Sequence, residues 1–134
     1  MLTVDVAAIA DGEVTSILLV QRANEPFAGA WALPGGFVEE NERVASAAAR
    51  ELEEETGLRA RALELLGVYD TPGRDPRGWT VSVVFFTRVH SRADVTGADD
   101  ASDARWFATS ELPALAFDHE LIVRHALGRY ASAR

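Results

Sequence analysis

The sequence contains no cysteine, no lysine and no long hydrophobic run. Without cysteine the chain has no disulfide framework, which is compatible with a reducing cytosol. No apolar run approaches the roughly 18 residues that a membrane-spanning helix needs. The N-terminal stretch MLTVDVAAIADGEV also lacks the basic segment and the continuous apolar segment of a signal peptide. We therefore expect a cytoplasmic protein with no membrane partner.

Positive charge is scarce as well. The chain has 13 arginines against 21 acidic residues, and its formal net charge is −8. This balance disfavours binding to a phosphate backbone, which needs an excess of positive side chains, so we expect no nucleic acid partner. Every fixed positive side chain is a guanidinium, which suits forked contacts with phosphate. Genome composition would explain the same bias equally well.

The composition is that of one ordinary globular domain. The chain has 134 residues, of which 48% are hydrophobic and 25% charged, and we expect a single domain over residues 1–134. LTVDVAAIA and VTSILLVQR, on either side of the turn signal DGE, predict an N-terminal β-hairpin. The other expected elements are an extended piece at 31–38, a helix from about 42 to Thr56, strands at 62–72, 80–89 and 104–107, and a closing helix at 118–130.

Particular residues mark the expected ends of the two helices. Asn41 and Asp118 are the expected N-cap residues, and Gly57 is expected to end the first helix. Strands that are interrupted by one helix and followed by another predict an α+β fold. We expect an α/β/α sandwich, with a mixed β-sheet between the two helices.

Acidic charge is concentrated in residues 39–55, which contain seven glutamates and only two arginines. At about 100° per residue, one arc of the predicted helix forms its core face. The residues of this arc are Val44, Ala45, Ala48, Ala49 and Leu52. Three glutamates then converge at the border of the core face, whereas Glu53 points away. The three are Glu51, Glu54 and Glu55.

Like charges at this spacing repel each other unless a cation lies among them. Carboxylate oxygens suit a hard divalent cation such as Mg²⁺ or Mn²⁺, which commonly bridges substrate phosphates. A solvated acidic face would explain the spacing of the glutamates about equally well. The flanking residues favour the metal site. In order, the segment reads Gly36, five residues, Glu42, seven residues, Arg50-Glu51-Leu52, one residue, Glu54-Glu55, one residue and Gly57-Leu58.

This segment resembles the Nudix box at every fixed position, and WALPGGFVE and the order of the strands also resemble the Nudix family. The resemblance implies a Nudix fold and a divalent metal, Mg²⁺ or Mn²⁺. Its ligands would be the carboxylates of Glu51, Glu54 and Glu55, with the carbonyl of Gly36. These glutamates and Arg50 would form the catalytic set, and Arg50 would pair with Glu42 to orient the ligands.

Members of the family hydrolyse a nucleoside diphosphate linked to another moiety, with water attacking a phosphorus atom. The general base is not fixed by the resemblance. Glu51, Asp99, Asp100 and Asp103 are candidates.

Three segments outside the box resemble the ADP-ribose pyrophosphatase branch of the family. They are GRDPRGWTVSVVFF, GADDASDARWF and LPALAFDHELI. The resemblance implies hydrolysis of ADP-ribose to AMP and ribose 5-phosphate. Arg74 and Arg77 would clamp a phosphate or a ribose, although a pairing with Asp75 or a dimer contact explains them about equally well.

Other residues are weaker candidates for substrate binding. Arg22 follows a strand and would reach a phosphate, or pair at the surface. Trp79, Phe27 or Trp31 would stack on adenine, but an aromatic side chain more often belongs to the core. His119 is expected to belong to the start of the closing helix.

Two other functions use the same box. One is a (d)NTP pyrophosphohydrolase that cleans the nucleotide pool, and the other is a non-catalytic domain that senses ADP-ribose for transcription control. We expect the sensor less, because the box is intact, the chain ends near residue 134 without space for a DNA-binding domain, and the net charge does not favour DNA. The resemblance also implies a homodimer.

Overall fold

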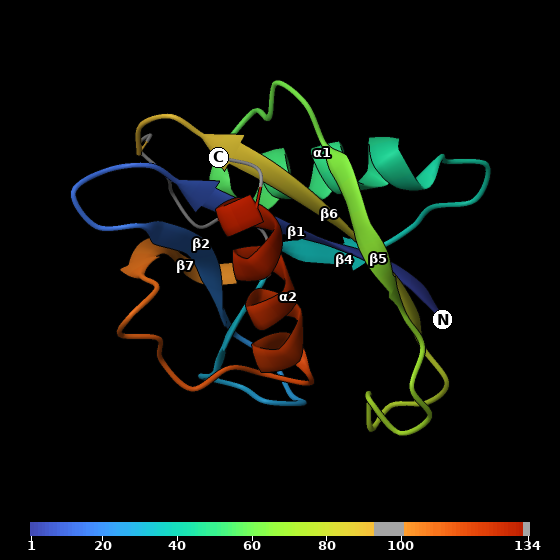
Figure 1. Ribbon diagram of the computed structural model, residues 1–134. Helices are drawn as coiled ribbons and strands as arrows, with labels where there is room; N and C mark the ends of the chain where they lie inside the picture. The colour runs from blue at the N-terminus through green and yellow to red at the C-terminus, as the bar shows by residue number, and fades with distance from the viewer. Residues whose placement is uncertain (93–100, 133–134) are drawn as a thin grey trace.

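The computed structural model describes residues 1–92 and 101–132, without the side chains of 101 and 102. Figure 1 shows the elements, which are β1 (Leu2–Ala10), β2 (Ser16–Arg22), β3 (Trp31–Ala32), β4 (Gly35–Phe37), α1 (Val44–Thr56), β5 (Glu64–Tyr69), β6 (Val81–Val89), β7 (Ala101–Ala108) and α2 (His119–Ser132). Neither helix in the described part of the chain is long and apolar enough to cross a membrane.

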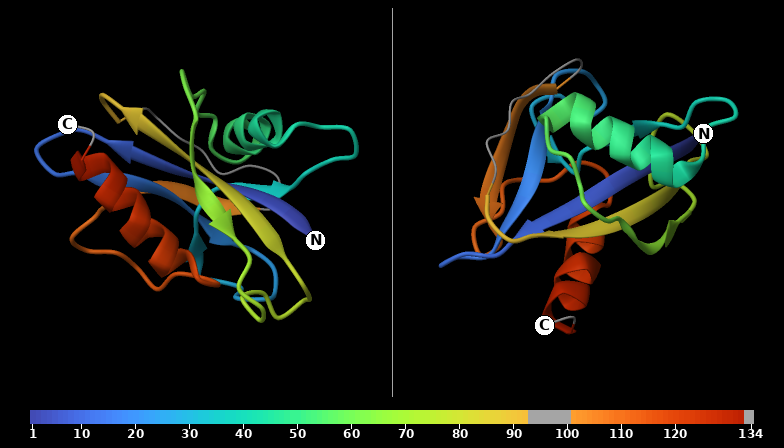
Figure 2. Two further views of the ribbon diagram at one scale, coloured as in Figure 1. Left: turned by 45° about the vertical axis from the view of Figure 1, so that its right-hand side comes forward. Right: turned by 90° about the horizontal axis from the view of Figure 1, so that it is seen from above.

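The strands form one mixed sheet in the order β3-β2-β1-β6-β5, with β4 also paired to β1 and β7 to β2. β1 runs parallel to β6 along its whole length, and the other pairings are antiparallel. Figure 2 shows α1 and α2 on opposite sides of this sheet. Each helix covers its own buried apolar cluster. The predicted α/β/α sandwich is therefore confirmed.

Strand β1 lies at the centre of the sheet and contributes to both cores. Because side chains alternate along a strand, Val4 and Val6 join the apolar cluster beneath α1. Ala7 and Ile9 join the cluster beneath α2. Asp5 belongs to the second set by the same alternation, so a carboxylate points to the α2 side of an otherwise apolar strand.

The predicted N-terminal hairpin forms, but its strands soon separate. β1 and β2 pair only beside the turn, where Ile9 is opposite Ile17 and Ala10 is opposite Ser16. Farther from the turn, β1 pairs with β4, while β2 pairs with β3 and β7. The strands of the hairpin therefore part to leave a space whose walls come from β1, β2 and the β3–β4 segment.

Helix α1 differs from its prediction at its N-terminus and agrees at its C-terminus. The helix begins at Val44, with Arg43 as its N-cap residue. The prediction of Asn41 as N-cap was wrong, because Asn41 lies in a turn with a φ of 64°. Gly57 ends the helix in the left-handed conformation, with a φ of 77°, as predicted.

The buried face of α1 is also rotated from the predicted one. Ala48 and Leu52 are buried as expected, but Ala45 and Ala49 are exposed, and Ala47 is buried instead. The physical reason is that β4 packs against α1 on the side of the glutamates. The rotation brings Glu51 and Glu55 inward, where both side chains are half-buried.

Candidate active site

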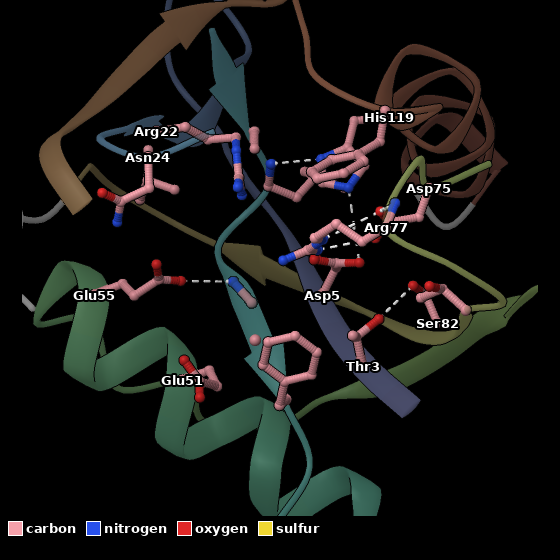
Figure 3. A pocket seen from close by; sticks show the side chains of 18 of the residues that line it. Thr3, Asp5, Arg22, Asn24, Glu51, Glu55, Asp75, Arg77, Ser82 and His119 are labelled. Carbon is pink, nitrogen blue, oxygen red and sulfur yellow. Dashed lines mark hydrogen bonds and ion pairs between the residues drawn. The ribbon is translucent and has the colours of Figure 1, made fainter. Parts of the chain in front are cut away.

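A cavity of about 550 Å³ occupies the space where β1 and β2 separate. α1, β1, β2, the β3–β4 segment, the loop before β6 and the start of α2 all contribute to its walls. Its size is within the range of sites that bind small organic ligands. Figure 3 shows Glu51 and Glu55 of α1 on one side of the β3–β4 segment, and Asp5 and His119 beyond it.

The carboxylates of α1 form one wall of this cavity. Glu51, Glu54 and Glu55 all line it. Glu55 Oε1 accepts a hydrogen bond of 2.7 Å from the backbone N–H of Gly35. A Cβ atom at Gly36 would lie only 2.6 Å from the carboxyl carbon of Glu51. Glycine is therefore required at position 36 for the backbone to approach the Glu51 carboxylate this closely.

Arg50 holds this acidic wall together. Its Nε and Nη2 atoms donate hydrogen bonds of 2.8 and 2.9 Å to the two oxygens of Glu42, which confirms the predicted pair. Its Nη1 atom donates to Glu51 Oε1 at 2.9 Å and to Glu54 Oε2 at 3.2 Å. Hydrogen bonds from Arg50 lower the pKa of Glu42 to about 2. Burial instead raises the pKa of Glu51, against the opposing effect of Arg50.

The acidic wall fits a divalent cation by the chemistry of its donors. The three glutamates and the backbone beside Gly36 offer only oxygen ligands, which Mg²⁺ and Mn²⁺ prefer. Among the described residues, no three acidic, histidine or cysteine side chains are gathered into a ready-made metal site. Glu55 contacts Gly35 instead, and Glu51 and Glu54 contact Arg50. Metal binding would therefore require these carboxylates to reorient.

Arginines provide positive charge in the same cavity. Arg22 and Arg77 both line it, and their guanidinium carbons lie 4.9 and 5.6 Å from the centre of the Phe117 ring. Burial, with a smaller effect of Arg77, lowers the pKa of Arg22. Arg77 also pairs with Asp75 at 2.9 Å, so the pairing considered as an alternative is present. Two neighbouring guanidinium groups favour an anion between them.

Arg74 lines the cavity, but its guanidinium is already engaged. Its Nε and Nη2 atoms donate hydrogen bonds to both carboxylate oxygens of Asp118, at 2.9 and 2.6 Å. Its Nη1 atom donates to Ser82 at 2.6 Å. The side chain is only 5% exposed. Arg74 therefore clamps a carboxylate of its own chain, and the carboxylate of Asp118, expected as an N-cap, accepts these bonds from Arg74.

The aromatic candidates lie outside the cavity walls. Trp79 is 73% exposed, and neither Trp79, Trp31 nor Phe27 contributes to the lining. Trp31 packs edge-on against Phe107, and Phe27 packs edge-on against Phe117. Phe117 and Phe37 are the aromatic residues of the cavity lining. Phe117 contacts both Arg22 and Arg77, and Phe37 contacts Arg77; neither was among the aromatic candidates.

Of the four candidate general bases, Glu51 lines the cavity. Asp103, on β7, is not among the lining residues, and its carboxylate pairs with Arg105 at 2.7 Å. Asp99 and Asp100 lie outside the described residues.

Asp5 and His119 are cavity residues that the sequence analysis did not identify as functional. Both are buried and both line the cavity. His119 is the first residue of α2, as expected, but its Nδ1 atom accepts a hydrogen bond of 3.0 Å from the N–H of Leu33. Burial lowers the pKa of His119 to about 4 and raises the pKa of Asp5 to about 7. In the sequence, Asp5 is the single acidic residue within the apolar stretch 2–10. This was the feature that could have marked it as functional.

Residues 1–126 match the family model of the NUDIX domain. Together with the mixed-sheet sandwich and the glutamates of α1, this match shows that the chain belongs to the Nudix family. The expectation drawn from the glycine, glutamate and arginine spacing is confirmed.

Two of the curated relatives are named for ADP-ribose. An ADP-ribose pyrophosphatase of Methanocaldococcus jannaschii is 51% identical over 108 residues, which are 81% of this chain and 63% of that protein. The ADPR responsive transcriptional repressor NtrR of Acinetobacter baylyi is 35% identical over 134 residues, or 96% of this chain and 54% of the repressor. The chain therefore spans between about half and two thirds of the length of these relatives.

Two solved structures share the fold. The NUDIX domain of Shewanella oneidensis NrtR, complexed with ADP ribose, is 33% identical with a TM-score of 0.92, over 97% of this chain and 88% of that chain. A bifunctional NMN adenylyltransferase/ADP ribose pyrophosphatase from Francisella tularensis was solved with AMP and a Mn ion. It is 32% identical with a TM-score of 0.83, over 96% of this chain and 41% of that chain.

Proposed function

We propose that this chain, acting as one Nudix domain, hydrolyses ADP-ribose with water to AMP and ribose 5-phosphate in a reaction that depends on a divalent metal. The observation that carries the proposal is that one cavity is lined both by three of the Nudix-box glutamates, Glu51, Glu54 and Glu55, and by the two arginines Arg22 and Arg77. A pyrophosphate between a cation on the glutamates and the two guanidinium groups would have its negative charge balanced from both sides. The 51% identity to an ADP-ribose pyrophosphatase supports this choice of substrate.

On the acidic side, we propose that Glu51, Glu54, Glu55 and the carbonyl of Gly36 hold Mg²⁺ or Mn²⁺. When bound, the cation would neutralise part of the pyrophosphate charge and lower the pKa of a water molecule. Arg50 is the positioning residue of this set, because it holds Glu51 and Glu54 while Glu42 holds Arg50.

On the basic side, Arg22 and Arg77 would donate hydrogen bonds to the phosphate oxygens. The Nε atom of Arg22 is fixed by the carbonyl of Pro26 at 2.7 Å. The guanidinium of Arg77 is held against Asp75. Each arginine is thus oriented by a hydrogen-bond acceptor of its own chain. Arg74 is assigned a structural role here, since Asp118 and Ser82 occupy its donors, and Trp79 has no role in the cavity.

A comparison of two neighbouring glutamates tests the metal site. Glu54→Gln should reduce turnover at least about a hundredfold, because it removes a negatively charged oxygen ligand from the acidic wall. Glu53→Gln is the matched control, since Glu53 is outside the cavity and pairs with Arg59. Thermal melting of both variants would show whether the fold is intact. Equal activity of the wild type and the Glu54 variant would contradict the assignment of the acidic wall as the metal site.

A second candidate function is binding of ADP-ribose without hydrolysis. It is supported by the 35% identity to an ADPR responsive repressor and by the TM-score of 0.92 with a NUDIX domain complexed with ADP ribose. A pyrophosphohydrolase acting on (d)NTPs is the third candidate, because the same acidic wall would serve both reactions.

One product assay separates these functions. The protein would be incubated with Mg²⁺ and equal concentrations of ADP-ribose, NADH, diadenosine polyphosphates, and canonical and oxidised dNTPs, and the products resolved by chromatography. We expect AMP and ribose 5-phosphate to form fastest. A nucleoside monophosphate with pyrophosphate from dNTPs would indicate the third function. Binding of ADP-ribose without any product would indicate the sensor.

A further inference from the structure

Asp5 is a buried carboxylate without a hydrogen-bond donor of its own. Its side chain is 10% exposed and lines the cavity. None of the described residues donates a hydrogen bond to its carboxylate, and His119 Nε2, at 3.8 Å from Oδ2, is beyond hydrogen-bond distance. Buried carboxylates are normally hydrogen-bonded or paired. A buried carboxylate that faces a cavity without a donor is therefore placed to accept a hydrogen bond from a ligand.

His119 supplies the complementary group beside it. Because Nδ1 accepts the hydrogen bond from the Leu33 N–H, the proton of the neutral ring must be on Nε2. Nε2 is the atom that faces Asp5. Figure 3 shows the imidazole between the backbone of the β3–β4 segment and the Asp5 carboxylate. One acceptor and one donor thus stand side by side on the cavity wall.

We infer that Asp5 and His119 form a recognition pair for a ribose hydroxyl of the substrate, in which the hydroxyl donates to Asp5 and accepts from His119. The separation of 3.8 Å allows one oxygen to lie about 2.8 Å from both atoms, which is normal hydrogen-bond length. Beside the ionised carboxylate a phosphate oxygen cannot take this place, because it has no proton to donate to Asp5. Acidic side chains bind ribose hydroxyls in the same way in dinucleotide-binding folds.

The position of the pair relative to the acidic wall favours a ribose. Gly35 lies directly between the two sites, because its N–H donates to Glu55 and a Cβ on it would lie 2.3 Å from Asp5 Oδ1. A ligand with its pyrophosphate at the glutamates would therefore place the group bonded to a phosphate, which is a ribose, next to Asp5. This inference rests on the proposed function and names the substrate group that selects for a ribose-containing diphosphate.

Two substitutions of His119 separate recognition from a purely structural role. His119→Asn places an amide oxygen near the position of Nδ1, so it keeps an acceptor for Leu33 and removes the donor at Nε2. His119→Gln places an amide nitrogen near Nε2, so it keeps the donor and removes the acceptor. Asp5→Asn removes the charge of the acceptor. Asp11→Asn is the matched control, since Asp11 follows the same strand and contacts Tyr130 and His90 outside the cavity.

The experiment measures binding of non-hydrolysable α,β-methylene ADP-ribose by isothermal titration calorimetry in the presence of Mg²⁺. We expect Asp5→Asn and His119→Asn each to bind at least about tenfold more weakly, the usual effect of losing a hydrogen bond to a buried polar partner. His119→Gln should retain more of the affinity than His119→Asn, and Asp11→Asn should bind like the wild type.

Three analogues identify the hydroxyl. The penalty of Asp5→Asn should disappear with the 2′-deoxyadenosine form if the pair binds the 2′-hydroxyl of the adenosine ribose, and with α,β-methylene ADP if it binds the terminal ribose. The third analogue carries hypoxanthine in place of adenine and keeps both riboses. If the penalty of Asp5→Asn disappeared only with this analogue, the pair would bind the base, and the assignment to ribose would be overturned. Unchanged binding in all variants, beside normal binding by the wild type, would overturn this inference and leave the proposed function in place. Failure of the wild type to bind α,β-methylene ADP-ribose would overturn both.

Discussion

Replacing Asp5 with asparagine should stabilise the protein, and the gain should grow with pH. Burial raises the pKa of this carboxyl from 3.8 to about 7. Between these two values the folded protein keeps a proton that the unfolded chain has released, so the contribution of Asp5 to the free energy of unfolding falls as pH rises. Below about pH 4 the carboxyl is protonated in both states, and above about pH 7 it is ionised in both.

The size of the effect follows from the two pKa values. A difference of about three pKa units corresponds to about 4 kcal/mol at roughly 1.36 kcal/mol per unit. Asparagine has nearly the same shape and stays neutral, so the variant does not lose this stability. The two proteins should therefore have nearly equal stability near pH 4, and the variant should be more stable by about 4 kcal/mol at pH 8.

Urea denaturation of both proteins with EDTA, at several pH values from 4.5 to 8, would measure this difference. His119 is deprotonated in the folded and the unfolded protein above about pH 7, so the values from pH 7 to 8 compare the two proteins without its titration. Asp11→Asn provides a control of opposite sign, because the hydrogen bond from Tyr130 lowers the pKa of Asp11, so the charged form of Asp11 stabilises the fold above pH 4. A difference in the free energy of unfolding between Asp5→Asn and the wild type that does not change with pH would refute the reasoning. So would a wild type more stable than Asp5→Asn at pH 8.

Other expected outcomes concern the acidic wall, the buried histidine and the assembly. Gly36→Ala should reduce turnover at least about tenfold with little change in melting temperature, because a Cβ would displace the flexible Glu51 side chain; unchanged kinetics would contradict this. Arg50→Lys should lower the free energy of unfolding by about 1 to 3 kcal/mol, as urea denaturation would show, since lysine cannot replace the forked contact with Glu42. His119→Asn should gain stability relative to the wild type as pH falls from 6.5 to 4, because only in the wild type does the unfolded chain take up a proton that the buried imidazole does not; a difference between the two proteins that does not change with pH would contradict it. Light scattering at micromolar concentration should give twice 14.5 kDa for a homodimer, and a monomeric mass would contradict that expectation.

The acidic wall was predictable from the sequence because its spacing is local. Residues three and four apart on one helix share a face whatever else the chain does, so the grouping of Glu51, Glu54 and Glu55 followed from their positions. Gly57 was equally predictable as the end of α1, since glycine adopts a positive φ without strain. The set of α1 residues that is buried could not be predicted exactly, because it depends on how β4 packs against the helix.

The opposite wall of the cavity required the tertiary structure. Asp5 and His119 come from the first strand and the last helix, and they meet only because β1 separates from β2 and α2 begins beside that opening. In the same way, a long-range contact with Asp118 removes Arg74 from the set of available phosphate ligands. The sequence by itself grouped the three glutamates of α1 through helical periodicity, and its resemblance to the Nudix box indicated their chemistry. The fold decided which distant polar side chains face the same cavity, because strand pairing and packing bring them together independently of their separation along the chain.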